Sequence, residues 1–113
     1  MAILPGVKNF DVKRRSDFPI RLTFKDSNGS AINLTGYTVA AMVYSDDRIS
    51  KYADWAITYT NRASGIIDMQ LSDTDTTNFT LSSLKYDVLL TDGNGLKQYY
   101  LEGTLTITEG YTT

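Results

Sequence analysis

Apolar and polar residues alternate with a period of two along much of this chain. Between residues 18 and 25, Phe18, Ile20, Leu22 and Phe24 alternate with polar residues and a proline. Such alternation predicts a strand with one buried face. Further extended segments are expected at residues 31–34, 37–45, 55–60, 66–71, 84–92 and 96–108.

Turn-forming residues separate these segments. Asn28-Gly29 suits the positive φ of a tight turn, residues 61–65 have the length of a hairpin loop, and residues 93–95 join the last two segments. Residues 72–79 are the candidate for one helical turn, which Ser72 would cap. About seven strands with at most one short helical turn predict an all-β, immunoglobulin-like antiparallel β-sandwich.

The length of 113 residues fits one β-sandwich domain over residues 1–113, with a candidate N-terminal arm at 1–7 and a tail at 109–113. Tyr86 starts a late strand after a polar corner. It is either a tyrosine corner, whose hydroxyl forms a hydrogen bond with the backbone earlier in the chain, or an ordinary inward-facing tyrosine. Gly103 would mark a bulge or a close backbone approach.

The composition argues against catalysis. Cys and His are both absent, which excludes disulfides and thiol nucleophiles and removes the commonest general base and metal ligand. The 13 acidic residues fall mostly in the expected turns, not as an apposed pair in a cleft. We therefore expect no enzyme activity, no cofactor and no small-molecule substrate.

Four acidic stretches superficially resemble metal sites. A calcium ion needs roughly six or more oxygen ligands, and none of the stretches supplies that number alone. Turn formation explains each of them, so no metal is expected. The stretches are residues 26–29, Asp46-Asp47, Asp73 with Asp75, and Asp92 with Asn94.

The charge pattern limits the partners. The formal net charge is −2 with both signs interspersed, which disfavours nucleic acid. The basic run at residues 13–15 is interpreted as a solvated strand end or turn. The apolar N-terminal stretch is too short for a signal peptide, and no stretch reaches the length of a membrane span. We expect synthesis in the cytoplasm and no membrane partner.

Three aromatic residues, Tyr52, Trp55 and Tyr59, could form a flat platform for sugar rings. Trp55 and Tyr59 have the even spacing of one strand face, which Ile57 shares. That spacing equally describes a core face, and core packing is favoured for at least one ring. A carbohydrate-binding or host-recognition module is therefore the alternative hypothesis.

A second apolar face is the more informative feature. Met42 and Tyr44 lie on the expected outward face of residues 37–45, and Leu89 and Tyr100 on that of the last hairpin, where Tyr99 is expected inward. If these strands are the neighbouring C, F and G strands of an immunoglobulin-type sheet, the four outward side chains form one patch. Such a patch favours a subunit contact, unless loops or the N-terminal segment cover it.

Residues 26–37, Asp-Ser-Asn-Gly-Ser-Ala-Ile-Asn-Leu-Thr-Gly-Tyr, resemble the D-x-x-G-x-x-I-x-L-T-G-Y pattern of immunoglobulin-like domains associated with tailed-bacteriophage baseplates and tail fibres. Residues 11–20 are similar to the opening of such domains. Residues 86–93 and 102–107 are similar to their final hairpin. The resemblance extends over residues 7–108. Among these phage domains, the chain resembles the N-terminal domain of baseplate upper proteins.

This resemblance implies a structural virion protein, an adaptor or spacer in the tail, baseplate, neck or fibre-attachment region, with a capsid decoration protein as a further alternative. Its partners would be other virion proteins and copies of itself, and its location the virion. The N-terminal segment could add a strand to a neighbour's sheet edge, with Ile3, Leu4 and Val7 as anchors.

Overall fold

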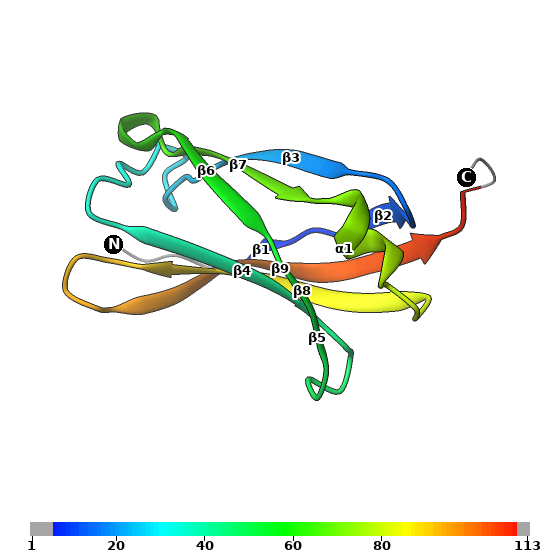
Figure 1. Ribbon diagram of the computed structural model, residues 1–113. Coiled ribbons are helices and arrows are strands. Elements are labelled where there is room, and N and C mark those ends of the chain that lie inside the picture. The colour runs from blue at the N-terminus through cyan, green and yellow to red at the C-terminus, as the bar shows by residue number, and fades with distance from the viewer. Residues whose placement is uncertain (1–5, 111–113) are drawn as a thin grey trace.

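The computed structural model describes residues 6–110 and shows an immunoglobulin-like β-sandwich of two sheets (Figure 1). The larger sheet, sheet A, contains β1 (Gly6–Val7), β2 (Phe10–Lys13), β4 (Thr38–Tyr44), β5 (Lys51–Asp54), β8 (Ser83–Thr91) and β9 (Lys97–Thr108). The smaller sheet, sheet B, contains β3 (Phe18–Thr23), β6 (Ala56–Asn61) and β7 (Ile66–Leu71). A 3-10 helix, η1 (Arg62–Ser64), and a short α-helix, α1 (Asp73–Thr77), lie in the connections.

Strands β3, β4, β6, β7, β8 and β9 coincide with predicted segments to within a few residues. The segment 31–34 instead makes one isolated bridge, between Ala31 and Lys25. The alternation of residues did not predict strands β1, β2 and β5, although residues 13–15 were interpreted as a strand end or turn. These strands are only two to four residues long, so their alternation is too brief to recognise.

Sheet A has the order β1-β9-β8-β4-β5, and β2 also pairs with β9. Strands β4, β8 and β9 are antiparallel neighbours at its centre, as predicted for the C, F and G strands. Strands β1 and β2 run parallel to β9. In sheet B, β7 lies between β3 and β6 and is antiparallel to both.

The chain changes sheets at Trp55. Strand β5 pairs with β4 in sheet A, and β6 pairs with β7 in sheet B. Between them the backbone N–H of Trp55 donates to the backbone carbonyl of Ala41 at 3.0 Å. The indole lies buried, with ring centroids 6.0 Å from Phe18 and 5.8 Å from Tyr86. This crossing ties the two sheets together along one side of the sandwich.

The core fills the space between the sheets with inward-facing residues of both. Strict alternation of burial along β8 and along residues 67–71 of β7 shows why the two-residue period was informative. Fully buried members come from both sheets and from the connecting segments: Val12, Phe24, Leu34, Val43, Ile67, Met69, Leu71, Phe79, Leu84, Val88 and Leu105.

The connection between β1 and β2 passes close to Gly103 of β9. A Cβ at this position would lie 1.9 Å from the Lys8 carbonyl oxygen, so only glycine admits that backbone. Tyr86, paired with Gly103 across β8 and β9, donates its hydroxyl to the same carbonyl at 2.6 Å. The expected close approach at Gly103 is thus confirmed. The upstream acceptor of Tyr86 lies in the β1–β2 connection, 78 residues earlier in sequence.

The predicted helical turn is present as α1 and carries a capping box. The Ser72 hydroxyl accepts from the Asp75 N–H, and the Asp75 carboxylate accepts from the Ser72 N–H, both at 3.1 Å. Thr76 is buried, and its hydroxyl is hydrogen-bonded to the backbone of Ser16 in the turn before β3. The helix therefore holds that turn against sheet B.

The basic run lies at the end of β2 and the turn after it, as interpreted from sequence. Arg14 and Arg15 both form ion pairs with Glu109, the Arg15 pair at 3.0 Å. Hydrogen bonds from the two guanidinium groups hold the pKa of Glu109 below its usual value. These charges fasten the chain beyond β9 to the turn between β2 and β3.

Candidate functional site

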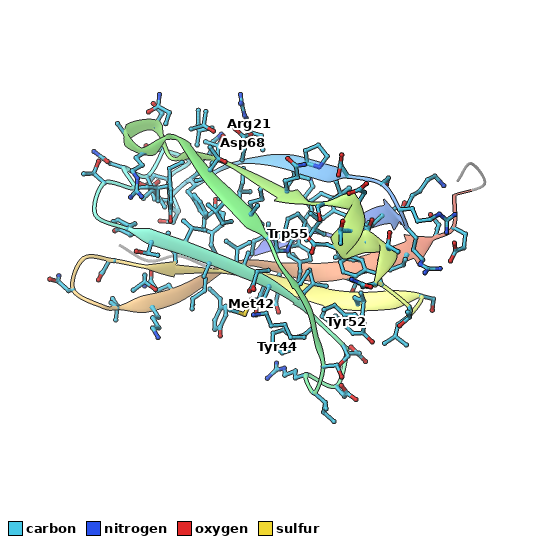
Figure 2. All side chains as sticks on the ribbon, viewed as in Figure 1. Arg21, Met42, Tyr44, Tyr52, Trp55 and Asp68 are labelled. Carbon is cyan, nitrogen blue, oxygen red and sulfur yellow. The ribbon has the colours of Figure 1, made fainter. Side chains whose placement is uncertain are left out.

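The outer face of sheet A presents apolar side chains from four strands. Along β4 and β8, every second residue faces away from the core, and Figure 2 shows Met42 and Tyr44 projecting on that side. Val7 and Tyr99 are 72% and 53% exposed. We call this surface the outer A face. Its apolar residues are Val7, Ala40, Met42, Tyr44, Leu89 and Tyr99.

The outer surface of sheet B differs in character. Arg21 on β3 faces Asp68 on β7, with two guanidinium–carboxylate contacts at 2.9 and 3.2 Å (Figure 2). The Thr60 hydroxyl also donates to Asp68. The Arg21 hydrogen bonds lower the pKa of Asp68 below its ordinary value. Paired charges and hydroxyls make this side a surface suited to water.

The outer A face is hollowed into an open groove of about 790 Å³. Figure 1 shows β5 and its loop projecting from sheet A on the side away from sheet B. Met42 and Asp87 lie in the groove, Tyr44 and Arg48 line it from the hairpin side, and Val7 lines it from β1. The groove therefore follows the face across the sheet and ends against the β4–β5 hairpin.

Two carboxylates lie in the middle of this face. Asp87 on β8 is paired with Glu102 on β9, and Met42 and Val7 are their next neighbours on β4 and β1. Burial and the nearby Glu102 raise the pKa of Asp87, while Arg48 acts in the opposite direction. Within residues 6–110 no salt bridge involves either acid. Sequence reasoning missed this pair, although two acids at like-facing positions of one hairpin were a signal.

Tyr100 does not lie on the outer A face, so its predicted place in the patch is wrong. The register shifts between Val88 and Leu89, so that Leu89 pairs with Tyr99 and Tyr100 becomes an extra residue. Such a β-bulge reverses the side-chain alternation beyond it. The Tyr100 ring packs 4.4 Å from Phe24, and its hydroxyl accepts from the Lys25 N–H at 2.9 Å. Tyr99, expected inward, takes the outer position.

Val7 belongs to the protein's own sheet. It pairs with Glu102 as part of β1, which differs from the free arm expected at residues 1–7. Its side chain remains exposed and lines the groove. Ile3 and Leu4, the other expected anchors, lie outside the described residues.

The three aromatic residues of the alternative hypothesis do not form an exposed platform. Trp55 is 4% exposed within the core. Tyr52 packs edge-on against Phe79. The Tyr59 hydroxyl accepts from the Val39 N–H at 2.9 Å, and Arg62 lies 3.7 Å above its ring. The even spacing of Trp55 and Tyr59 reflects core packing.

The acidic stretches act in turns. Asp26, Asp47 and Asp92 each accept backbone N–H groups two residues on, and Asp75 belongs to the α1 cap. The part of the chain described here holds no group of three acidic residues placed to bind a metal ion. In the same part, no helix has the length and apolar character needed to cross a bilayer.

Comparisons with known proteins concern the fold. No family model matches the chain, and no curated protein matches its sequence. A chain in the crystal structure of ICOS in complex with ICOS-L and an anti-ICOS-L VNAR domain is similar, with a TM-score of 0.53 and 13% identity over 91% of this chain and 55% of that one. The Lin-41 filamin domain has a TM-score of 0.48 and 18% identity, covering 88% and 84%.

Proposed function

We propose that this chain is a structural protein of a tailed-bacteriophage virion. It acts as an adaptor or spacer in the tail, baseplate, neck or fibre-attachment region, in several copies, with the outer A face as its contact surface. The observation that carries the proposal is the difference between the two outer surfaces of the sandwich. One is polar and ion-paired, and the other presents apolar side chains from four strands.

The apolar residues of the outer A face, of which Val7 and Tyr99 are exposed and Met42 and Leu89 half-buried, lie on neighbouring strands. Met42, Leu89 and Tyr99 come from adjacent strands β4, β8 and β9, and Val7 extends the surface to β1. Large apolar side chains gathered on one outer surface are uncommon on free-standing proteins and are typical of contact surfaces. Tyr and Met are also enriched where interfaces are buried. Burying this face against a neighbour would remove it from water.

The sequence resemblance at residues 26–37 supports the viral assignment. A capsid decoration protein would use the same surface and differ only in where the copies lie. The carbohydrate-binding alternative has lost the exposed platform that motivated it, because Trp55 is buried in the core and Tyr52 and Tyr59 pack half-buried against it.

Purification of phage particles tests the assignment. Particles from the culture that carries the gene are banded on a density gradient, and the chain is quantified with an antibody against a reference virion protein. We expect it in the band, in several copies per particle. Its absence from intact particles would contradict the proposal.

Variants test the surface. Tyr99→Asp and Met42→Asp place a charge on the outer A face and should reduce incorporation by at least about tenfold, since a desolvated unpaired charge costs several kcal/mol. Gln70→Asp is the matched control, because Gln70 is exposed on the central strand of sheet B. Circular dichroism verifies that each variant is folded. Equal incorporation of all three would exclude this face as the contact.

A further inference from the structure

The centre of the outer A face is a row of residues that crosses four strands. Val7, Glu102, Asp87 and Met42 are successive cross-strand partners from β1 to β4. The two ends of the row are apolar, and its middle is two carboxylates on adjacent strands. Like charges directly opposite each other destabilise a sheet. The pairing of Asp87 with Glu102 therefore lowers the stability of the free protein.

Two cationic side chains, Lys85 and Arg48, line the groove near the row. Lys85 donates to Thr104 Oγ1 at 2.7 Å, and its ammonium lies 3.8 Å from Asp46. Arg48 offsets part of the charge at Asp87, yet burial and Glu102 outweigh it. Asp68 on sheet B, by contrast, has a bidentate arginine partner. Within residues 6–110, Asp87 and Glu102 lack such a pairing.

We propose, building on the contact role proposed above, that the outer A face binds a segment of another protein that presents a Lys or Arg side chain between apolar side chains. The cation would lie between Asp87 and Glu102, and its apolar neighbours would cover Met42, Tyr99 and Val7. When the interface excludes water, a cation placed between the two acids would offset their mutual repulsion. Charge complementarity of this kind also fixes which partner binds and in which register.

A second copy of this chain placed face to face fits less well. A two-fold contact brings the same patch of both subunits together. The acidic centre would then meet itself, and like charges brought together at an interface cost several kcal/mol. The groove of about 790 Å³ also leaves room for side chains to enter, which a flat self-contact would leave unfilled.

Selection of peptides tests the partner chemistry. The immobilised full chain is panned against a displayed library of random peptides, with counter-selection against the Tyr99→Asp variant to remove peptides that bind elsewhere. We expect the enriched peptides to carry Lys or Arg flanked by apolar residues. Replacing that basic residue with Gln should weaken binding about tenfold or more.

Charge variants identify the acceptors. The Asp87→Asn/Glu102→Gln double variant keeps the size of both side chains and should lose about tenfold or more in affinity for the enriched peptides. Asp11→Asn removes an exposed carboxylate of β2 and should bind like the wild type. Enrichment without basic residues, equal binding by the double variant, or no enrichment over counter-selection would overturn the inference, as would concentration-dependent dimers abolished by Tyr99→Asp.

The two proposals fail separately. If the chain is in the particles and Tyr99→Asp reduces incorporation, but the double variant is incorporated normally, the contact role stands and the cationic partner is wrong. If the chain is absent from particles while the enriched peptides bind as described, the viral assignment fails and the partner chemistry stands.

Discussion

Gly103 lets the β1–β2 connection lie close against β9. The Lys8 carbonyl occupies the space that a side chain at position 103 would need. Gly103→Ala should lower the free energy of unfolding by about 1–3 kcal/mol, the usual cost of overpacking. Gly93→Ala is the control, since a Cβ there meets its nearest atom at 3.7 Å. Urea unfolding measures both. Wild-type stability for Gly103→Ala would show that the β1–β2 connection does not pass this closely.

Tyr86 couples the core to the same carbonyl. Tyr86→Phe should cost about 1 kcal/mol at neutral pH through the lost hydrogen bond. Tyr99→Phe, whose phenol is exposed, should cost little. Urea unfolding of both at pH 7 tests this, and equal stability would mean that the hydroxyl contributes nothing.

The phenol of Tyr86 also makes stability depend on alkaline pH. Burial raises its pKa from 10.0 to about 12. A raised pKa means that the folded state favours the neutral phenol, so this stabilisation is complete below pH 10.0 and is lost as the pH rises toward about 12. Unfolding free energies at pH 9 and pH 11 should therefore fall more steeply for the wild type than for Tyr86→Phe. Parallel decreases would contradict the shift.

Sequence reasoning anticipated these two positions and missed a third. Glycine in a strand and a tyrosine after a polar corner are local signals, and both Gly103 and Tyr86 could be singled out from them. The bulge at Tyr100 has no such signal, because two consecutive tyrosines fit either phase of the alternation. The pairing of Leu89 with Tyr99 decides which ring faces outward.

At the scale of elements, the β8–β9 pair carries a like-charge cross-strand contact between Asp87 and Glu102. Burial and Glu102 raise the pKa of Asp87, so its ionised form destabilises the fold, and stability rises as the pH falls through that raised pKa. Asp87→Asn should therefore stabilise the protein at pH 7 by about 0.5 kcal/mol, the size of one cross-strand pair. The gain should shrink toward pH 3. Thermal unfolding with Asp11→Asn as control measures it, and a destabilised Asp87→Asn would show that the acid is compensated within the chain.

The strands that could be predicted are those with long alternation. Strands β4, β8 and β9 contain seven to twelve residues, and their neighbour relation followed from the order of elements in an immunoglobulin-type sheet. Strand β5 carries Lys51 and Asp54 within four residues and depends on pairing with β4. The formation of β5, and of the groove beside it, therefore depends on tertiary pairing with β4, which no local sequence pattern encodes.

At the scale of the whole molecule, the two surfaces of the sandwich differ in chemistry. The surface of sheet B carries the ion pair of Arg21 and Asp68, and the outer A face joins apolar side chains to Asp87 and Glu102, which form no ion pair within residues 6–110. The sandwich and the doubly apolar strand β4 were readable from the sequence. The outward-facing positions of Asp87 and Glu102 were also readable, but their pairing was not, because it depends on the register of β8 and β9.

Imaging of the purified virus particle at subunit resolution tests the central claim most directly. We expect repeated copies of this sandwich in the tail, baseplate, neck or fibre-attachment region, each with strands β4, β8 and β9 covered by a neighbouring protein. Copies whose outer A face is open to solvent, or particles without the sandwich, would contradict the account.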